Sequence, residues 1–196
     1  MEKLTEIGAA TLALEIVVAT LALEIVLATY RSGVTEAQAV VDKVRVDRKP
    51  RLLAVSSGGG HWVQLLRLRS AFAGWDVSYA STFASQAKDL VGAPIYVVPD
   101  SSRFAKSTLP KVGWMALTIV LKVRPKAIVT TGSMPALFFL LAGRLIGSKT
   151  LWIDSIANSG RLSTSGRMAR HIAHQVVSQW PDVAKAEGVD YWGSVL

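Results

Sequence analysis

From Leu52 onward, short apolar runs alternate regularly with stretches of helical character, and this alternation limits the chain to few folds. Each apolar run is too short for a helix and reads as a buried strand. We expect strands at Leu52–Ser56, Asp76–Ser81, Ile95–Val98, Ala127–Thr130, Thr150–Asp154 and Gln175–Ser178. Helices are expected at Trp62–Phe72, at Leu109–Val123 and from the Gly132-Ser133-Met134-Pro135 turn through Ile146. Strands that alternate with helices predict an α/β fold with a doubly wound parallel sheet.

Polar and glycine-rich segments follow four of these strands directly. They are Gly58–His61, Thr131–Ser133, Asp154–Ser155 and Gln179–Trp180. Ligands of doubly wound sheets bind outside the carboxyl ends of the strands. The sequence therefore predicts one shared site at this edge of the sheet.

The first of these segments, Ser56-Ser57-Gly58-Gly59-Gly60-His61, lies between a strand and a helix. Three glycines let backbone N–H groups come close to an anion, and the start of a helix adds partial positive charge. Ser57, Gly58, Gly59 and Gly60 are therefore candidates to bind a phosphate or diphosphate. The segment has neither the Walker pattern nor the G-x-G-x-x-G dinucleotide pattern. The alternative is an ordinary tight turn in which His61 only caps the helix.

The other segments supply further candidate residues. Asp154, at the end of a buried strand, is suited to general-base chemistry, or else caps the next helix. The stretch from Arg161 to Arg167 offers hydroxyls and two guanidinium groups to an anionic or sugar ligand, or is a polar loop. Trp180 either stacks on a sugar or belongs to the core. The candidates for ligand binding are Gly132, Ser133, Ser155, Arg161, Ser163, Ser165, Gly166 and Arg167, with Gln179 and Trp180 as partner or sugar contacts.

Residues 1–30 are predicted to form an apolar helix that precedes the globular domain. The apolar run Ile7–Thr29 is long enough to span a membrane, but Glu15 and Glu24 lie on opposite sides of such a helix. We expect a membrane anchor that spans the bilayer or lies on it; the alternative is a helix packed on protein. Residues 31–50 read as a basic linker, which places the globular domain on the cytoplasmic face of the membrane or is simply solvated.

The overall composition agrees with contact to lipid or to anionic ligands. The 196 residues are 51% hydrophobic, carry a net charge of +8 and include no cysteine. Basic residues also flank the apolar stretch Leu109–Val123, which holds Trp114 and is either a membrane-facing patch or a buried helix. His171 and His174 read as structural residues of a helix, and we predict no metal site. Net charge alone does not support nucleic-acid binding.

The four motifs, in this order, resemble the family of the membrane-anchoring subunit of dolichyl-diphosphate N-acetylglucosamine transferase. The likeness is closer to its bacterial branch in exopolysaccharide and capsule synthesis, which includes anchoring subunits of bipartite glucuronosyl- and galactosyltransferases. It covers 51–196 and implies a Rossmann-like domain, the N-terminal half of a GT-B glycosyltransferase. Two departures are Asp154, where eukaryotic relatives usually have Glu, and Asn158, where many have Arg.

The resemblance implies a membrane-associated, acceptor-binding subunit of a two-component inverting glycosyltransferase. A separate donor-binding chain, the C-terminal GT-B half, would hold a UDP-sugar, and a lipid-diphosphate-linked saccharide would accept the sugar without a metal or other cofactor. Asp154 is our first candidate for the base and His61 our second. A non-catalytic scaffold that recruits a soluble transferase subunit is the alternative, and a nucleotide-dependent oxidoreductase is disfavoured by the missing dinucleotide pattern. Which sugar is donated stays open.

Overall fold

The computed structural model describes residue 33 and residues 49–100 and 108–195. The chain divides into two units between Arg48 and Lys49, and the fold below belongs to the second unit. The predicted anchor at 1–30, and the predicted linker up to Arg48 except Gly33, lie outside the described residues. Of the described helices, none combines the length and the apolar character that crossing a bilayer requires.

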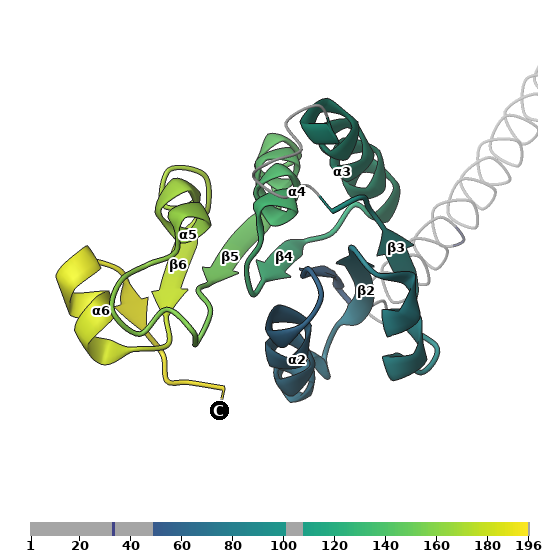
Figure 1. The fold of residues 1–196 in the computed structure, drawn as a ribbon. Helices are drawn as coiled ribbons and strands as arrows, with labels where there is room; N and C mark the ends of the chain where they lie inside the picture. The colour runs from purple at the N-terminus through teal and green to yellow at the C-terminus, as the bar shows by residue number, and fades with distance from the viewer. Residues whose placement is uncertain (1–32, 34–48, 101–107, 196) are drawn as a thin grey trace, which may run out of the picture. The chain divides into compact units, whose positions relative to one another are not determined.

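Seven parallel strands form one sheet in the order β3-β2-β1-β4-β5-β6-β7 (Figure 1). The strands are β1 (Arg51–Val55), β2 (Asp76–Ser81), β3 (Ile95–Val97), β4 (Ala127–Thr130), β5 (Lys149–Ile153), β6 (Gln175–Ser178) and β7 (Asp190–Tyr191). The order reverses between β1 and β4, which are paired neighbours in the middle of the sheet. The prediction of a doubly wound parallel α/β sheet is confirmed. The sequence analysis missed β7, because two exposed residues carry no apolar run.

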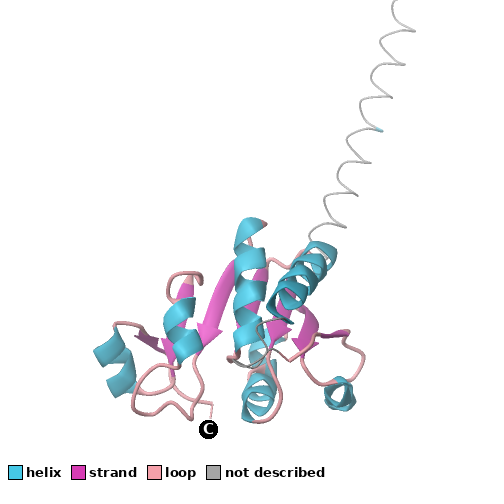
Figure 2. Cartoon of the chain, turned by 45° about the horizontal axis from the view of Figure 1, so that its top comes forward, coloured by secondary structure: helices cyan, strands magenta, loops and turns pink. Residues whose placement is uncertain are grey.

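Helices cover both faces of this sheet (Figures 1 and 2). They are α2 (Gly60–Arg67), α3 (Leu109–Val123), α4 (Met134–Leu145), α5 (Thr164–Ala169) and α6 (Pro181–Glu187), with 3-10 helices η1 (Arg69–Phe72) and η2 (Ala84–Asp89). The predicted helix Trp62–Phe72 is thus divided into α2 and η1. The α5 helix ends at Ala169, so His171 and His174 lie in the following loop and not on a helix as expected.

Alternation along the strands builds two hydrophobic cores. In β1, Leu53 and Val55 contribute to the core beneath α3, α4 and α5, whereas Leu52 and Ala54 contribute to the core beneath α2 and η1. Successive side chains of a strand point to opposite faces of the sheet, so a fully buried strand is apolar at every position. This burial on both faces explains why the strands appear in the sequence as unbroken apolar runs.

The α3 helix covers the sheet with one side only. On this side of the helix, Val112, Ala116 and Val120 are fully buried. Trp114, on another side, is 68% exposed. The helix ends at Arg124, which adopts a left-handed conformation (φ 47°) directly before Pro125. One side of Leu109–Val123 is therefore buried against the sheet, and the other exposes Trp114 and Leu121 beside Lys111 and Lys122; the membrane-facing patch stays a prediction.

Candidate functional site

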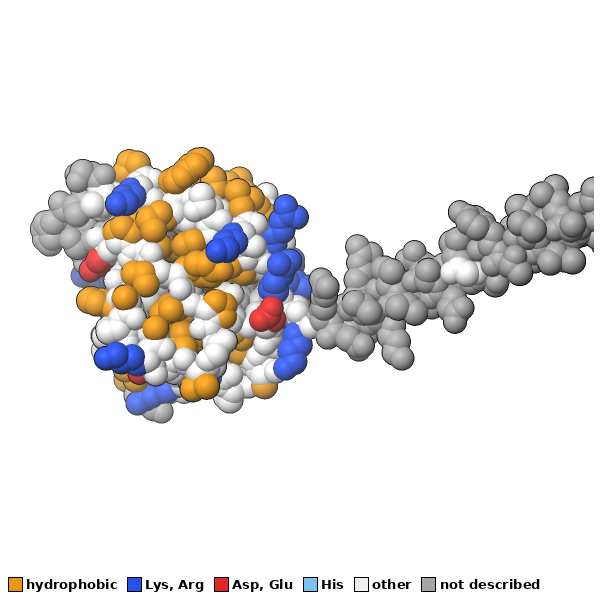
Figure 3. All heavy atoms as spheres, turned by 90° about the vertical axis from the view of Figure 1, so that its right-hand side faces the viewer, with side chains coloured by type: hydrophobic (Ala, Val, Ile, Leu, Met, Phe, Trp, Pro, Cys, Tyr) orange, Lys and Arg blue, Asp and Glu red, His pale blue; other side chains and the backbone are white. Residues whose placement is uncertain are grey.

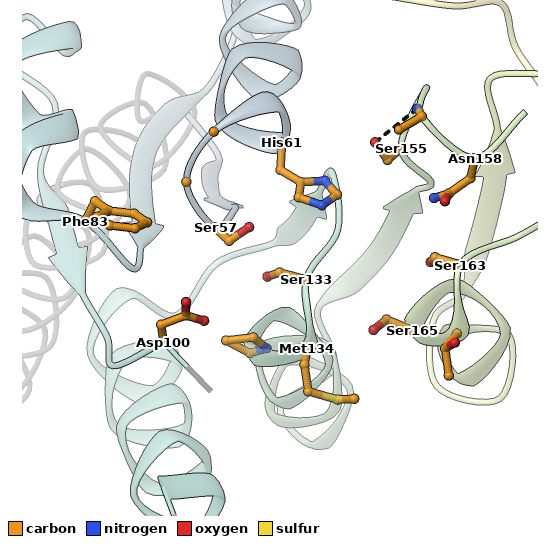
Figure 4. A pocket seen from close by; sticks show the side chains of 15 residues that line it. Ser57, His61, Phe83, Asp100, Ser133, Met134, Ser155, Asn158, Ser163 and Ser165 are labelled. Carbon is orange, nitrogen blue, oxygen red and sulfur yellow. Dashed lines mark hydrogen bonds between the residues drawn. The ribbon is translucent and has the colours of Figure 1, made fainter. Parts of the chain in front are cut away.

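A pocket of about 540 Å³ lies at the carboxyl edge of the sheet, where the loops after β1, β2, β3, β4 and β5 meet (Figure 4). We call it the edge pocket. Its walls bring together eight of the residues singled out in the sequence: Ser57, Gly58, Gly59, His61, Ser133, Ser155, Ser163 and Ser165. These residues come from segments up to 108 positions apart, from Ser57 to Ser165.

The glycine-rich loop forms one wall of the edge pocket and opens α2. Gly59 caps this helix with φ 63°, and no side chain caps its first turn. Gly58 has no room for a side chain, because a Cβ there would lie 2.3 Å from the Phe83 ring. The loop therefore presents backbone amides at the start of a helix, an arrangement suited to an anion.

His61 projects from α2, and its ring nitrogens have distinct surroundings. Nδ1 lies 2.8 Å from the carbonyl oxygen of Thr131, while the Thr131 hydroxyl donates to the His61 carbonyl oxygen at 2.7 Å. The ring packs on Gly132, where an added Cβ would lie 2.7 Å from Cε1. A carbonyl only accepts, so Nδ1 carries the proton in the neutral imidazole and Nε2 keeps its lone pair. Among the described residues, Nε2 has no hydrogen-bond partner.

Ser133 combines backbone strain with an unsatisfied hydroxyl at the start of α4. Its backbone lies at φ 95° and ψ 151°, a region that glycine adopts freely and other residues adopt at a cost. Its Oγ is buried and has no hydrogen-bond partner. Buried hydroxyls are nearly always paired, so an orphan one in a pocket wall is typical of a ligand site. No side chain caps the first turn of α4.

The Asp154 carboxylate is only 2% exposed and lies behind the pocket wall, not in it. Oδ1 accepts from the Trp152 indole at 3.1 Å and from the Ser163 hydroxyl at 2.6 Å. Oδ2 accepts from the Ser163 amide at 2.8 Å and the Asn158 amide group at 3.2 Å. Ser163 in turn caps α5 by accepting from the Gly166 amide at 2.8 Å. Asp154 thus holds the loop that forms the β5 side of the pocket.

A buried amide pair links this loop to α2 and to the C-terminal segment. Gln179 donates from Nε2 to Gln64 Oε1 at 2.7 Å and to the Asp154 carbonyl oxygen at 2.9 Å. Its Oε1 accepts from the Val195 amide at 2.9 Å. Trp180 donates to the Ile156 carbonyl oxygen at 2.7 Å. Gln179 and Trp180 therefore support the loops around the pocket from outside its wall.

The remaining predicted residues also lie outside the wall of the edge pocket: Gly60, Gly132, Asp154, Arg161, Gly166 and Arg167. Both arginines are exposed. Several lining residues were not among the predicted site residues: Phe83, Asp100, Met134, Pro135, Ala157, Asn158 and Thr164. Phe83 and Asp100 follow β2 and β3, so the rule that found the other segments also points to them. Within the described residues, no three His, Asp or Glu side chains gather as a metal site needs.

Comparison with known proteins identifies the type of fold. No model of a known protein family matches the chain. It is 24% identical over 164 residues to the UDP-N-acetylglucosamine transferase subunit ALG14 of Mus musculus, covering 67% of this chain and 76% of that protein. The MurG structure from Acinetobacter baumannii superposes with a TM-score of 0.56 at 17% identity, covering 68% of this chain and 42% of that one.

A UDP-N-acetylglucosamine 2-epimerase from Rickettsia bellii superposes with a TM-score of 0.60 at 12% identity, covering 76% of this chain and 46% of the epimerase. The chain therefore spans less than half the length of either solved structure. The domain has the Rossmann-like α/β fold of GT-B glycosyltransferases and their structural neighbours. The similarity to a transferase subunit supports a glycosyltransferase-related role.

Proposed function

We propose that this chain is the acceptor-binding subunit of a two-component, inverting glycosyltransferase of polysaccharide biosynthesis. It would bind a lipid-diphosphate-linked saccharide at the membrane, while a second chain holds the UDP-sugar. The observation that carries the proposal is the edge pocket, in which amides at helix starts, free hydroxyls and an imidazole nitrogen converge at the carboxyl edge of the sheet. The mouse relative is a transferase subunit, which supports a division of the enzyme between chains.

The diphosphate is proposed to bind through neutral donors. Among the described residues that line the pocket there is no lysine or arginine. Backbone amides at the starts of α2 and α4 point partial positive charge at an anion, and the hydroxyls of Ser57 and Ser133 add donors. Arg161 and Arg167 are each two positions from a lining serine and stay candidates for longer-range attraction. No metal or other cofactor enters the proposal.

We assign the general base to His61 in preference to Asp154. The Asp154 carboxylate is buried and accepts four hydrogen bonds, whereas His61 lines the pocket and its Nε2 has no hydrogen-bond partner among the described residues. In the proposed step, an acceptor hydroxyl gives its proton to Nε2 as its oxygen bonds to the anomeric carbon of the donor sugar. The bond from that carbon to the diphosphate oxygen breaks on the opposite side, and UDP leaves.

Membrane association is proposed to involve the outer surface of α3 and α4. Trp114 and Leu121 of α3 and Leu141 and Leu145 of α4 are exposed, and the two helices are in contact. Between Asp100 and Asp154 the sequence has eight lysines and arginines and no acidic residue. Figure 3, which faces the side of the molecule carrying α3 and β3, shows hydrophobic side chains extending to the top and basic side chains along one margin. An apolar surface with basic neighbours suits an anionic bilayer.

The test is transfer of labelled sugar from UDP-sugars to lipid-diphosphate saccharides, with the chain alone and with the partner that copurifies from its native membranes. We expect transfer only with the partner. His61→Gln should lower turnover at least 100-fold, the usual contribution of a general base being about that size or more, while acceptor binding persists. Turnover by the chain alone would refute the division between two chains. Full turnover by His61→Gln would support the alternative, a scaffold that recruits a catalytic subunit.

A further inference from the structure

The edge pocket has two chemically different ends. One end, after β2 and β3, carries Phe83 and Asp100; the other, after β5, carries Ser155, Ser163 and Ser165. The strand order places β1 and β4 between them, so His61 and Ser133 occupy the middle. Figure 4 shows the same spatial order across the pocket, from Phe83 and Asp100 on one side to Asn158 and Ser165 on the other.

We infer that the β2/β3 end is a saccharide-binding subsite formed by Phe83 and Asp100. The inference rests on the proposed function and adds to it the orientation of the acceptor. The sugar lies against Phe83 and Asp100, and the diphosphate lies toward the middle and the β5 end. His61, in the middle, then meets a hydroxyl of that sugar.

Phe83 provides the apolar surface of the subsite. Its ring packs against Gly58 at a distance that leaves no space for a Cβ, and half of its surface stays exposed. A half-exposed aromatic ring fixed in a pocket wall offers a flat surface to the C–H face of a pyranose. Met134 and Pro135 contribute further apolar surface to the same pocket.

Asp100 provides the polar half of the subsite. It is exposed, lines the pocket, and makes no salt bridge or hydrogen bond with the described residues. An ionised carboxylate only accepts hydrogen bonds, so it can accept from two sugar hydroxyls but repels a phosphate. The repulsion places the diphosphate toward the middle and the β5 end of the pocket, where the described lining residues carry no acidic side chain.

The Ser133 hydroxyl gives an independent sign that this part of the pocket binds a polar ligand. It is buried without a partner, and in Figure 4 it points toward the side where Ser57 and Asp100 lie. A ligand that reaches from the middle of the pocket toward Asp100 would satisfy this hydroxyl.

The experiment compares two kinds of probe on the full chain in detergent by titration calorimetry. One is a short-chain polyprenyl diphosphate; the other is the same lipid carrying glucose, galactose or N-acetylglucosamine. We expect at least one sugar to tighten binding. Phe83→Ala and Asp100→Asn should each reduce that gain about tenfold, the size of one lost charged hydrogen bond or stacking contact. The gain of each variant is measured against its own binding of the sugar-free lipid, so that a change affecting both probes equally does not count as loss of the gain.

Val91→Ala and Asp182→Asn are matched controls, because both residues are exposed and neither lines the pocket. If the wild-type chain binds no probe, the proposed function fails. If it binds the sugar-free lipid and none of the sugars adds affinity, or if both subsite variants keep the gain, only the subsite is overturned. Ser165→Ala separates the two orientations, since loss of the gain in this variant would place the sugar at the β5 end.

Discussion

At the residue scale, two polar side chains near the edge pocket differ in their hydrogen bonding: all four hydrogen bonds of the Asp154 carboxylate are made within the protein, whereas the Ser133 hydroxyl has no partner. The Asp154 carboxylate is buried with four donors, so its charge is compensated inside the protein. The Ser133 hydroxyl is buried with no partner, on a strained backbone. Complete pairing is typical of a group that holds structure together, whereas an unsatisfied group in a pocket wall indicates a place for a ligand.

Asp154→Asn should destabilise the protein by about 2 kcal/mol. An asparagine has one acceptor oxygen, and its NH₂ would face donors from Ser163 or Asn158. The free energy of unfolding in urea measures this loss. Asp182→Asn, an exposed acid on α6, serves as control and should change stability little. Unchanged stability of the Asp154 variant would contradict a structural role for this carboxylate.

Ser133→Gly should raise the free energy of unfolding by about 1 kcal/mol while weakening ligand binding. Glycine adopts the observed φ and ψ without strain, but it lacks the hydroxyl aimed into the pocket. Ser133→Ala also removes the unsatisfied hydroxyl but keeps the backbone strain, so it should be less stable than Ser133→Gly. Urea unfolding compares the wild type with the two variants. A Ser133→Ala variant more stable than Ser133→Gly would show that the backbone of Ser133 is not strained.

His174 should make stability depend on pH. Partial desolvation of the His174 ring, which is largely exposed, together with the cations of Arg144 and Lys149, lowers its pKa from the usual 6.5. Its Nδ1 accepts from the Thr150 amide at 3.2 Å, which requires a neutral ring. As pH falls below 6.5, the unfolded chain takes up a proton that the folded chain resists, and stability decreases until the pH passes the lowered pKa.

Unfolding in urea at pH 7.5 and 5.5 measures this effect. His174→Ala should lose less stability than the wild type between these two pH values. Val91→Ala, which removes no titratable group, should keep the wild-type dependence. An identical pH dependence of the wild type and His174→Ala would show that this imidazole is not responsible.

At the element scale, the contacts of its first turn hold α5 in place, because the helix itself is short. It has only six residues, and Ser163 caps it while also donating to Asp154. Short helices are marginal without tertiary support. The position of the β5 side of the edge pocket therefore depends on the contact between this turn and the end of β5.

Gly166→Ala should destabilise the protein by about 1–3 kcal/mol. A Cβ at Gly166 would lie 2.7 Å from Asp154 Oδ1 and 2.9 Å from the Ser163 hydroxyl, so it would push this contact apart. Gly160→Ala is the control, because a Cβ there has no neighbour within 4 Å. Thermal unfolding compares the two variants. Equal stability of the two variants would mean that the first turn of α5 accommodates the added Cβ with no loss of stability.

At the scale of the whole molecule, two surfaces with different chemistry belong to one small domain. The edge pocket is polar and lies at the carboxyl ends of the strands. The outer surface of α3 and α4 exposes Trp114, Leu121, Leu141 and Leu145 together with the basic side chains of Lys111, Lys122 and Arg144. An apolar surface of this kind on a domain usually marks contact with lipid or protein.

Trp114→Ala should weaken binding of the full chain to vesicles that contain anionic phospholipid by about 30-fold, because a buried indole contributes roughly 2 kcal/mol. Vesicle sedimentation measures the bound fraction. Trp192→Ala is the matched control, since Trp192 is also exposed, at 62%, but lies near the C-terminus. If both variants bind vesicles like the wild type, α3 has no role at the membrane.

The sequence determined the sheet and the region of the site. Burial on both faces requires apolar residues at every strand position, so six of the seven strands were visible, and β2, β4, β6 and α3 have the predicted bounds. The carboxyl-edge rule brought Gly58, Gly59, His61, Ser133 and Ser155 to one pocket, because parallel strands all end at the same edge.

Only the tertiary structure decided whether each residue lines the edge pocket or lies behind its wall. Nothing local distinguishes the exposed Asp100 from the buried Asp154, since both are acids that follow strands; only the donors from Trp152, Asn158 and Ser163 make the difference. The orientation of His61 depends on Thr131, 70 positions away. Sequence periodicity reports which face of an element is buried, whereas these contacts join segments whose distance in the chain carries no signal.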